Sequence, residues 1–229
     1  MIDLLEISKK YITHKTKQDF MHLYKNYFES FRNKKLNLLE IGIDKGNSLR
    51  VWREFFSNAN IIGIDIEKKD FKIDGVDFFI GDQSNLNFLK TVINKYKTFD
   101  IIIDDGSHFT KHIITSFNIL FPYLNENGMY IVEDLQTSYI PRYGGSRFKL
   151  NKKNTSMNFF KRLSDSVNYE QYDKPFIKKN FYDGKIKSIH FHQNIIFVSK
   201  GNSINYYHPN PIKNTFLSYI KKIFSKLFD

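Results

Sequence analysis

Short apolar runs alternate with segments of helical spacing along the first two thirds of the chain. Residues 8–33 begin this pattern, with Phe, Tyr and Leu recurring every three or four positions, which predicts helices. Five apolar runs follow and read as strands: Leu36–Ile43, Ile61–Ile66, Val76–Ile80, Phe99–Ile103 and Met129–Val132. Helical segments lie between most of them: Ser48–Phe56, Leu86–Tyr96 and His112–Phe121. This alternation predicts a parallel sheet with helices on both faces.

The pattern changes in the last third of the chain. Gln136–Thr155 is rich in Gly, Arg, Tyr and Asn and is too long for a plain connector, so we expect a binding loop or a lid. A helix is predicted at Ser156–Asn168. Two polar residues separate the strands expected at Ile186–His192 and Ile195–Lys200, as in a hairpin. The whole pattern predicts a Rossmann-like α/β domain with seven strands, mostly parallel and closed by an antiparallel hairpin, under an N-terminal helical cover.

The domain organisation follows from the absence of a linker or an internal repeat. We assign residues 1–213 to one domain that includes the N-terminal helices. Residues 214–229 place apolar side chains on one face and lysines on the other, which predicts an amphipathic basic helix. This helix could dock on its own domain, on a dimer partner or on a membrane surface. No segment reaches the roughly 20 apolar residues of a membrane span.

Composition narrows the possible chemistry. The chain has no cysteine, which excludes disulfides, thiolate zinc sites and cysteine nucleophiles. Acidic residues stand at its start, where a signal peptide would be basic and apolar, so we expect a cytoplasmic protein. The formal charge of +11 could indicate a polyanionic partner. Because the lysines are scattered rather than gathered in one motif, we expect no nucleic-acid binding.

A glycine-containing loop follows the first predicted strand. Gly42 and Gly46 are spaced G-x-x-x-G between Glu40 and Ser48, which matches neither the dinucleotide fingerprint nor the P-loop. Glycines let the backbone approach a ligand closely. Asp65 ends the second strand and can accept hydrogen bonds from both hydroxyls of a ribose, whereas Glu40 favours a cationic group nearby. A ribose, an adenine and a sulfonium cation are the parts of S-adenosylmethionine, which the loop and Asp65 together indicate.

Asp82 and Gln83 follow the third strand and would reach the adenine edge. The alternative for Asp82 is a helix cap for Asn85–Tyr96. We keep both interpretations at this stage.

Two pairs of acids follow the fourth and fifth strands. Asp104 and Asp105 leave one buried strand, and Glu133 and Asp134 leave the next. Adjacent buried carboxylates are costly unless a cation or hydrogen-bond donors compensate them. Oxygen ligands without cysteine favour Mg²⁺, or Mn²⁺ or Ca²⁺, over zinc. His108 lies in a turn three residues past Asp105, where it could act as a base.

Several segments together resemble a known family. They are LLEIGIDKGNSLRVWREFF, IIGIDI, GDQSN, FDIIIDDGSH, SFNILFPYL and GMYIVEDLQTSY, followed by Tyr143-Gly144-Gly145, and the match runs in order from about Thr13 to Gly145. These segments resemble the macrocin/mycinamicin-type sugar O-methyltransferases. Members of this family are class I enzymes that depend on S-adenosylmethionine and a metal ion, and they have relatives in bacterial polysaccharide gene clusters.

The resemblance implies roles for individual residues. It implies that Asp105, Glu133 and Asp134 hold Mg²⁺ and that His108 is the catalytic base. The cofactor contacts that it implies are Glu40, Gly42, Ser48, Asp65, Asp82 and Gln83, to which we add Gly46 and Asp104 from the same loops. In the long loop after Asp134 we expect Thr137, Tyr139 and Tyr143 to contact the acceptor.

The chain departs from the family pattern at two places on the acceptor side. Thr13-His14-Lys15 stands where the family often has Thr-Asp-Lys, and Gln136 stands where it often has His. These departures leave the substrate open but not the type of reaction. We expect methylation of a sugar hydroxyl in the biosynthesis of a surface polysaccharide. The acceptor would be a nucleotide-activated sugar or another small molecule. We expect the protein to be a homodimer.

Two alternatives remain. The first is O-methylation of a non-sugar acceptor, such as a phosphate-type, phenolic or other natural-product oxygen. The second is a nucleic-acid methyltransferase or binding protein. Base methyltransferases usually carry Asn/Asp-Pro-Pro-aromatic after the fourth strand, where this chain has DDGSH.

Overall fold

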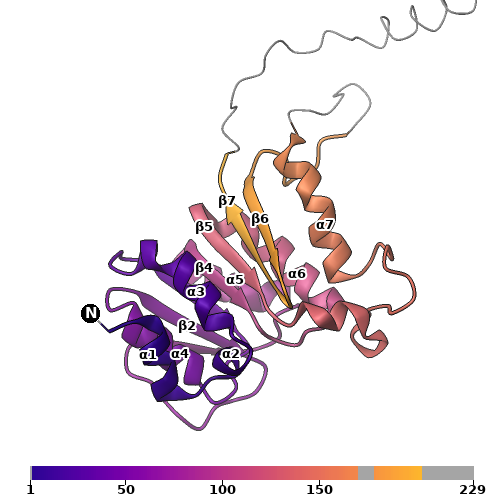
Figure 1. The fold of residues 1–229 in the computed structure, drawn as a ribbon. Coiled ribbons are helices and arrows are strands. Elements are labelled where there is room, and N and C mark those ends of the chain that lie inside the picture. The colour runs from indigo at the N-terminus through magenta and orange to yellow at the C-terminus, as the bar shows by residue number, and fades with distance from the viewer. Residues whose placement is uncertain (1, 170–177, 203–229) are drawn as a thin grey trace, which may run out of the picture.

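Seven strands form one sheet in a computed structural model of the chain, which describes residues 2–169 and 178–202 (Figure 1). The strand order is β3-β2-β1-β4-β5-β7-β6. The strands are β1 (Asn37–Ile41), β2 (Asn60–Asp65), β3 (Val76–Ile80), β4 (Phe99–Asp104), β5 (Leu124–Val132), β6 (Ile186–His192) and β7 (Ile195–Lys200). β1 to β5 pair in parallel, and β7 runs antiparallel to both β5 and β6. The predicted sheet with its closing hairpin is confirmed.

Helices cover both faces of the sheet (Figure 1). One face packs against α1 (Leu4–Tyr11), α3 (Phe20–Phe28) and α4 (Asn47–Phe55), and the other against α5 (Leu86–Tyr96), α6 (Thr110–Leu120) and α7 (Ser156–Val167). Among the described residues the remaining helix is the short α2 (His14–Lys17), and 3₁₀ turns occupy Glu29–Phe31, Phe121–Tyr123, Leu135–Tyr139 and Pro141–Tyr143. No helix in the two described ranges is long and apolar enough to cross a bilayer.

The two cores explain why the central strands are almost entirely apolar. Successive side chains of a strand point to opposite faces. Leu38 of β1 therefore packs with α1, α3 and α4, whereas Leu39 packs with α5 and α6. Ile101 and Ile102 of β4 divide in the same way. A sheet that is covered on both faces needs apolar residues at consecutive positions, which is the pattern in the sequence.

The N-terminal cover differs from the prediction. The expected helical stretch 8–33 begins earlier, at Leu4, where Asp3 forms a capping box. It is then broken twice. Ile12 adopts a left-handed conformation at the end of α1, and Asp19 does so before α3. Hydrophobic spacing does not record these local backbone turns, which separate α2 from its neighbours and let it turn toward the sheet.

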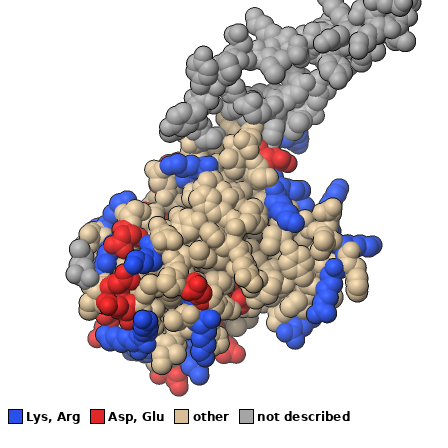
Figure 2. All heavy atoms as spheres, viewed as in Figure 1, with Lys and Arg blue, Asp and Glu red and all other residues tan. Residues whose placement is uncertain are grey.

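Charged side chains are spread over the surface. On the face in Figure 2, Lys and Arg lie in separate groups around the margin, and those beside α1 are interleaved with Asp and Glu. The amphipathic helix predicted at 214–229 lies outside the described residues.

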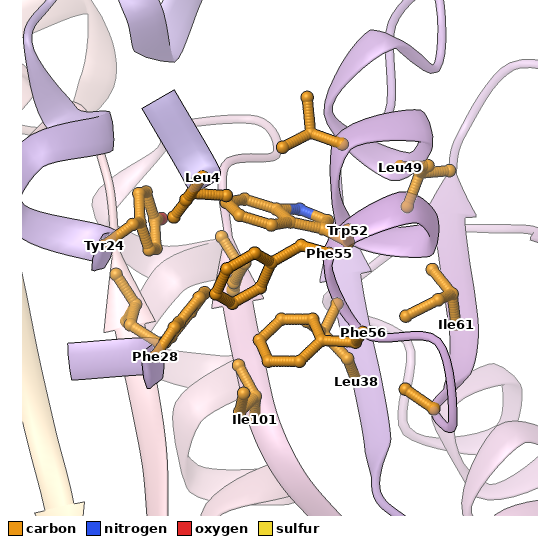
Figure 3. Packing of buried hydrophobic residues seen from close by; sticks show 14 of the residues in the cluster. Leu4, Tyr24, Phe28, Leu38, Leu49, Trp52, Phe55, Phe56, Ile61 and Ile101 are labelled. Atoms are coloured by element: carbon orange, nitrogen blue, oxygen red, sulfur yellow. The ribbon is translucent and has the colours of Figure 1, made fainter. Parts of the chain in front are cut away.

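An aromatic cluster joins the N-terminal cover to the sheet (Figure 3). The Trp52 ring of α4 lies 5.1 Å from that of Tyr24 and 5.5 Å from that of Phe28, both on α3. Phe28 also contacts Phe56 at 5.5 Å between ring centres. All four side chains are fully buried. The cover is therefore part of the core rather than an appendage.

We expect Phe28→Ala to lower the free energy of unfolding by about 3–5 kcal/mol, because it removes a buried ring and leaves a cavity. Urea denaturation followed by circular dichroism measures this change. Phe148→Ala is the matched control, because the Phe148 side chain is 95% exposed. An equal effect of the two substitutions would show that the cover contributes no core packing.

Candidate functional site

A cavity of about 610 Å³ opens at the carboxyl ends of the parallel strands. Residues that end or follow β1, β2, β3, β4 and β5 line it, among them Gly42, Asp65, Asp82, Asp105 and Asp134. Ligands of open α/β sheets bind at this edge, near the point where the strand order reverses. Here β1 lies between β2 and β4, so the reversal falls at β1 and its glycine loop.

Gly42 lets two loops of the site touch. Its φ is +83°, and a Cβ atom at this position would lie 2.1 Å from the carbonyl oxygen of Asp105. Any other residue would push apart the loops that follow β1 and β4. The cofactor loop predicted from the sequence is therefore packed directly on the DDGSH segment.

Asp65 is held at the rim of the cavity by several donors. Its Oδ2 accepts a hydrogen bond from the Ile43 amide at 3.1 Å and lies 3.0 Å from Lys69 Nζ, and its Oδ1 accepts from the Glu67 amide at 2.9 Å. Partial burial acts to raise the pKa of Asp65, but the Glu67 and Ile43 amides and Lys69 together lower it. The carboxylate is thus ionised and fixed in the wall of the cavity.

The loops after β3 and β4 are joined by Gln83. The side-chain amide of Gln83 donates to Asp104 Oδ1 at 2.9 Å, and its oxygen accepts from the Ser107 amide at 2.7 Å. Asp82 lines the cavity and accepts hydrogen bonds from the amide and hydroxyl of Ser84 at 2.7 and 2.8 Å. The side-chain cap of α5 is Asn85, not Asp82.

Asp104 lies beneath the site rather than in it. Its side chain is buried, and Ser116 donates to its Oδ2 at 2.5 Å. Burial raises the pKa of Asp104, although hydrogen bonds from Ser116 and Gln83 oppose this. Because Asp104 does not line the cavity, this placement suits a role in holding Gln83 rather than the cofactor contact that we predicted.

Glu40, Ser48 and Gly46 are also set back from the cavity. Glu40 is fully buried, and its Oε2 accepts hydrogen bonds from the Ser48 hydroxyl at 2.9 Å and from Trp52 Nε1 at 3.1 Å. Gly46 caps α4 and packs against Phe71. None of the three predicted cofactor residues lines the main cavity, although Ser48 lines a smaller neighbouring one of about 230 Å³.

A buried lysine connects three of the acids. Lys15 of α2 has a side chain that is only 3% exposed. Its Nζ lies 2.6 Å from Asp105 Oδ2, 2.7 Å from Glu133 Oε1 and 3.1 Å from Glu40 Oε1. Burial alone would lower the pKa of Lys15, but the three carboxylates hold it well above its usual value. Burial, reinforced by the neighbouring Asp105, raises the pKa of Glu133.

Asp105, His108 and Asp134 form a group of potential metal ligands in the described part of the chain. One ligand atom from each lies within 4.8 Å of the others. His108 Nε2 is 3.7 Å from Asp134 Oδ2. His108 and Asp134 both have a positive φ, of +59° and +53° respectively. Backbone strain of this kind concentrates at functional sites, because the surrounding structure must maintain it.

The residues predicted to contact the acceptor lie beside this group, but none of them lines the cavity. Thr137 is buried and donates its hydroxyl to the Asp134 carbonyl at 2.7 Å. The Tyr143 ring packs edge-on against Phe109, with 5.3 Å between centres. Tyr139 ends the 3₁₀ turn that follows Asp134. Phe109 itself lines the cavity, and 43% of it is exposed.

Three residues of the N-terminal cover reach the acids, and sequence reasoning assigned a role to none of them. They are Lys15, Gln18 and Tyr24. Lys15 was noted only as part of a departure from the family pattern, and Tyr24 only as part of a helical repeat. The sequence indicates only that several buried acids require a compensating cation. It does not show which of the 35 Lys and Arg residues supplies that cation.

Comparisons with known proteins agree with the resemblance. Mycinamicin VI 2''-O-methyltransferase of Micromonospora griseorubida is 35% identical over 215 residues, which are 87% of this chain and 53% of that enzyme. Demethylmacrocin O-methyltransferase of Streptomyces fradiae is 35% identical over 210 residues, again 87% of this chain and 53% of the enzyme. No family model matches.

A solved structure extends the likeness to the fold. It is the MycE methyltransferase from the mycinamycin biosynthetic pathway in complex with Mg, SAH and mycinamycin VI, with a TM-score of 0.85 and 32% identity. The match covers 97% of this chain and 59% of that one, and the chain spans about half the length of the curated relatives it matches. The chain is thus a homologue of the macrocin- and mycinamicin-type sugar O-methyltransferases, with the sheet of a class I methyltransferase.

Proposed function

We propose that the protein transfers a methyl group from S-adenosylmethionine to a sugar hydroxyl with the help of a divalent cation. One observation carries this proposal: a single cavity is lined both by Gly42 and Asp65 and by Asp105, His108 and Asp134. A nucleoside cofactor and a cation-bound acceptor could therefore meet in one space. The relatives' names and the MycE complex with Mg and SAH agree with this arrangement.

The cofactor half of the site suits a nucleoside with a small cationic substituent. Asp65 offers an ionised acceptor to ribose hydroxyls, and Asp82 and Gln83 line the cavity beyond it. Gly42 keeps the loop close to the ligand space. Our assignment therefore rests on Gly42, Asp65, Asp82 and Gln83 as direct contacts, with Glu40, Gly46, Ser48 and Asp104 supporting the loops.

The chemistry of the donor set suits Mg²⁺. Asp105, Glu133 and Asp134 all line the cavity and offer carboxylate oxygens, which are the ligands that Mg²⁺ prefers. We assign the ion to these three residues, which leaves His108 free. When bound, Mg²⁺ would contact the acceptor hydroxyl and make it more acidic.

His108 is the residue that we assign to proton transfer. A sugar hydroxyl is hardly ionised near neutral pH, so its attack on a methyl group requires a base. The His108 ring lines the cavity beside Asp105 and Asp134, and histidine is the side chain best suited to this role near neutrality. His108 also has a left-handed backbone conformation, with a φ of +59°.

The acceptor class that we propose is a glycosyl hydroxyl. The relatives act, by their names, on mycinamicin VI, on demethylmacrocin and on a rhamnosyl tetracenomycin. A surface glycan presents the same chemistry. Incubating the protein with labelled cofactor and separate panels of nucleotide-activated sugars, glycan fragments and polyketide glycosides tests the proposal, because mass spectrometry identifies which panel gains a methyl group. No methylation in any sugar panel would contradict it.

We expect Asp65→Ala to weaken binding of S-adenosylhomocysteine by about 1–3 kcal/mol, because the ribose hydroxyls lose an ionised acceptor. Isothermal titration calorimetry measures the dissociation constant. Asp77→Ala is the control, since Asp77 is an ion-paired acid that does not line the cavity. An unchanged constant for Asp65→Ala would remove Asp65 from the cofactor site.

Chelation separates the two halves of the site. Excess EDTA should abolish methyl transfer, because the acceptor hydroxyl would no longer be activated by the ion. Added Mg²⁺ should restore the activity. Binding of S-adenosylhomocysteine should largely survive, since none of the four direct cofactor contacts is a proposed ligand. Full turnover in EDTA, with negligible metal by elemental analysis, would refute the proposed role of the ion.

His108→Ala should lower kcat by roughly 10²–10⁴-fold, the usual range for the loss of a general base. Binding of Mn²⁺ and of S-adenosylhomocysteine should remain close to wild type. His22→Ala is the control, because the His22 side chain is 64% exposed and lies outside the cavity. If His108→Ala loses the metal instead, His108 is a ligand and not the base.

A further inference from the structure

The three acids assigned to the metal share one feature: each has one oxygen bound by protein groups. Asp105 Oδ2 is 2.6 Å from Lys15 Nζ. Glu133 Oε1 accepts a hydrogen bond from the Tyr24 hydroxyl and lies 2.7 Å from Lys15 Nζ. Asp134 Oδ1 accepts from the side-chain amides of Gln18, at 3.2 Å, and Gln136, at 3.0 Å. Four donors thus fix the three carboxylates.

The second oxygen of each acid is left for the cavity. Within residues 2–169 and 178–202, no side chain or amide donates a hydrogen bond to Asp105 Oδ1 or Glu133 Oε2. Among the described residues, the ion-pair partner of Asp134 Oδ2 is the His108 ring, whose Nε2 lies 3.7 Å away. All three acids line the cavity. A carboxylate held by one oxygen presents the other in a defined direction, as metal sites require of their ligands.

Three of the four donors come from one stretch of ten residues. Lys15 belongs to α2, Gln18 follows it and Tyr24 belongs to α3, whereas Gln136 follows β5. Two of the acids they bind also follow β5, and the third follows β4. The N-terminal cover therefore supplies the outer contacts of a site whose ligands all come from the sheet.

We propose that Lys15 and Tyr24 are positioning residues that orient Asp105 and Glu133 for a divalent cation. This inference rests on the proposed function, because it takes those acids as metal ligands. Lys15 holds the carboxylates that follow two neighbouring strands at one point. Tyr24 binds the same oxygen of Glu133 through its hydroxyl. Without these contacts the two acids would repel each other and rotate away from a common ligand geometry.

An opposite role for Lys15 is physically reasonable. A fixed ammonium beside two ligands could simply compete with the incoming cation, and its removal would then strengthen metal binding. Tyr24 is uncharged and cannot compete in this way. The two residues together therefore distinguish orientation from competition.

The test is the dissociation constant for Mn²⁺, measured by electron paramagnetic resonance on the full chain saturated with S-adenosylhomocysteine. The variants are Lys15→Met, which keeps the length of the side chain, and Tyr24→Phe, which keeps the buried ring. Lys17→Met is the matched control, because Lys17 lies in the same short helix and is exposed. Thermal unfolding of each variant reports whether the chain is folded.

We expect Lys15→Met and Tyr24→Phe each to weaken Mn²⁺ binding about 10–100-fold, the usual effect of losing a group that orients a metal ligand. Lys17→Met should bind as wild type does. Wild-type affinity in folded Tyr24→Phe, or unchanged or tighter binding in folded Lys15→Met, overturns the inference. If Lys15→Met does not fold, Tyr24→Phe alone decides. A wild-type chain that binds no Mn²⁺ refutes the proposed metal site itself, which is a separate outcome.

Discussion

The structure depends on the compensation of buried negative charge by one lysine. Glu40, Asp105 and Glu133 meet at the carboxyl ends of β1, β4 and β5, where Glu40 and Glu133 are almost completely shielded from water. Charges buried in this way are stable only when they are paired and hydrogen-bonded. Lys15 supplies the pairing. The position of α2 follows from this requirement, because the helix must bring the ammonium to all three acids.

The buried acids are also linked to the aromatic packing of the N-terminal cover. α3 buries Tyr24 and Phe28 against Trp52, whose indole nitrogen in turn donates to Glu40. The apolar packing of the cover and the polar contacts of the site thus share residues. A substitution that disturbs the apolar packing of the cover is therefore expected to disturb the polar contacts of the site as well, even where the sheet is unchanged.

Sequence reasoning performed well wherever a local pattern dictates structure. β3, α5, β6 and β7 have the predicted bounds, because hydrophobic periodicity and turn residues mark them. The family resemblance implied that acids after β4 and β5 share one metal ion, and the structure places Asp105 and Asp134 close together. Lys15, Gln18 and Tyr24 could not be predicted. Their partners lie about a hundred residues away, and no periodicity encodes which basic or phenolic side chain turns inward. The inward turn of Asp104 was missed for a similar reason, since Gln83 and Ser116 decide it.

The distance along the chain between these partners has a consequence for biosynthesis. Lys15 is separated from Asp105 by 90 positions, and Tyr24 from Glu133 by 109. Domains emerge from the ribosome with the N-terminal end first. The helical cover is therefore made before β4 and β5 are, and until then its lysine and its tyrosine lack these partners. A nascent chain can assemble the site only after β5 has left the exit tunnel. A ribosome that stalls before that point carries the N-terminal helices without the acids that complete the site.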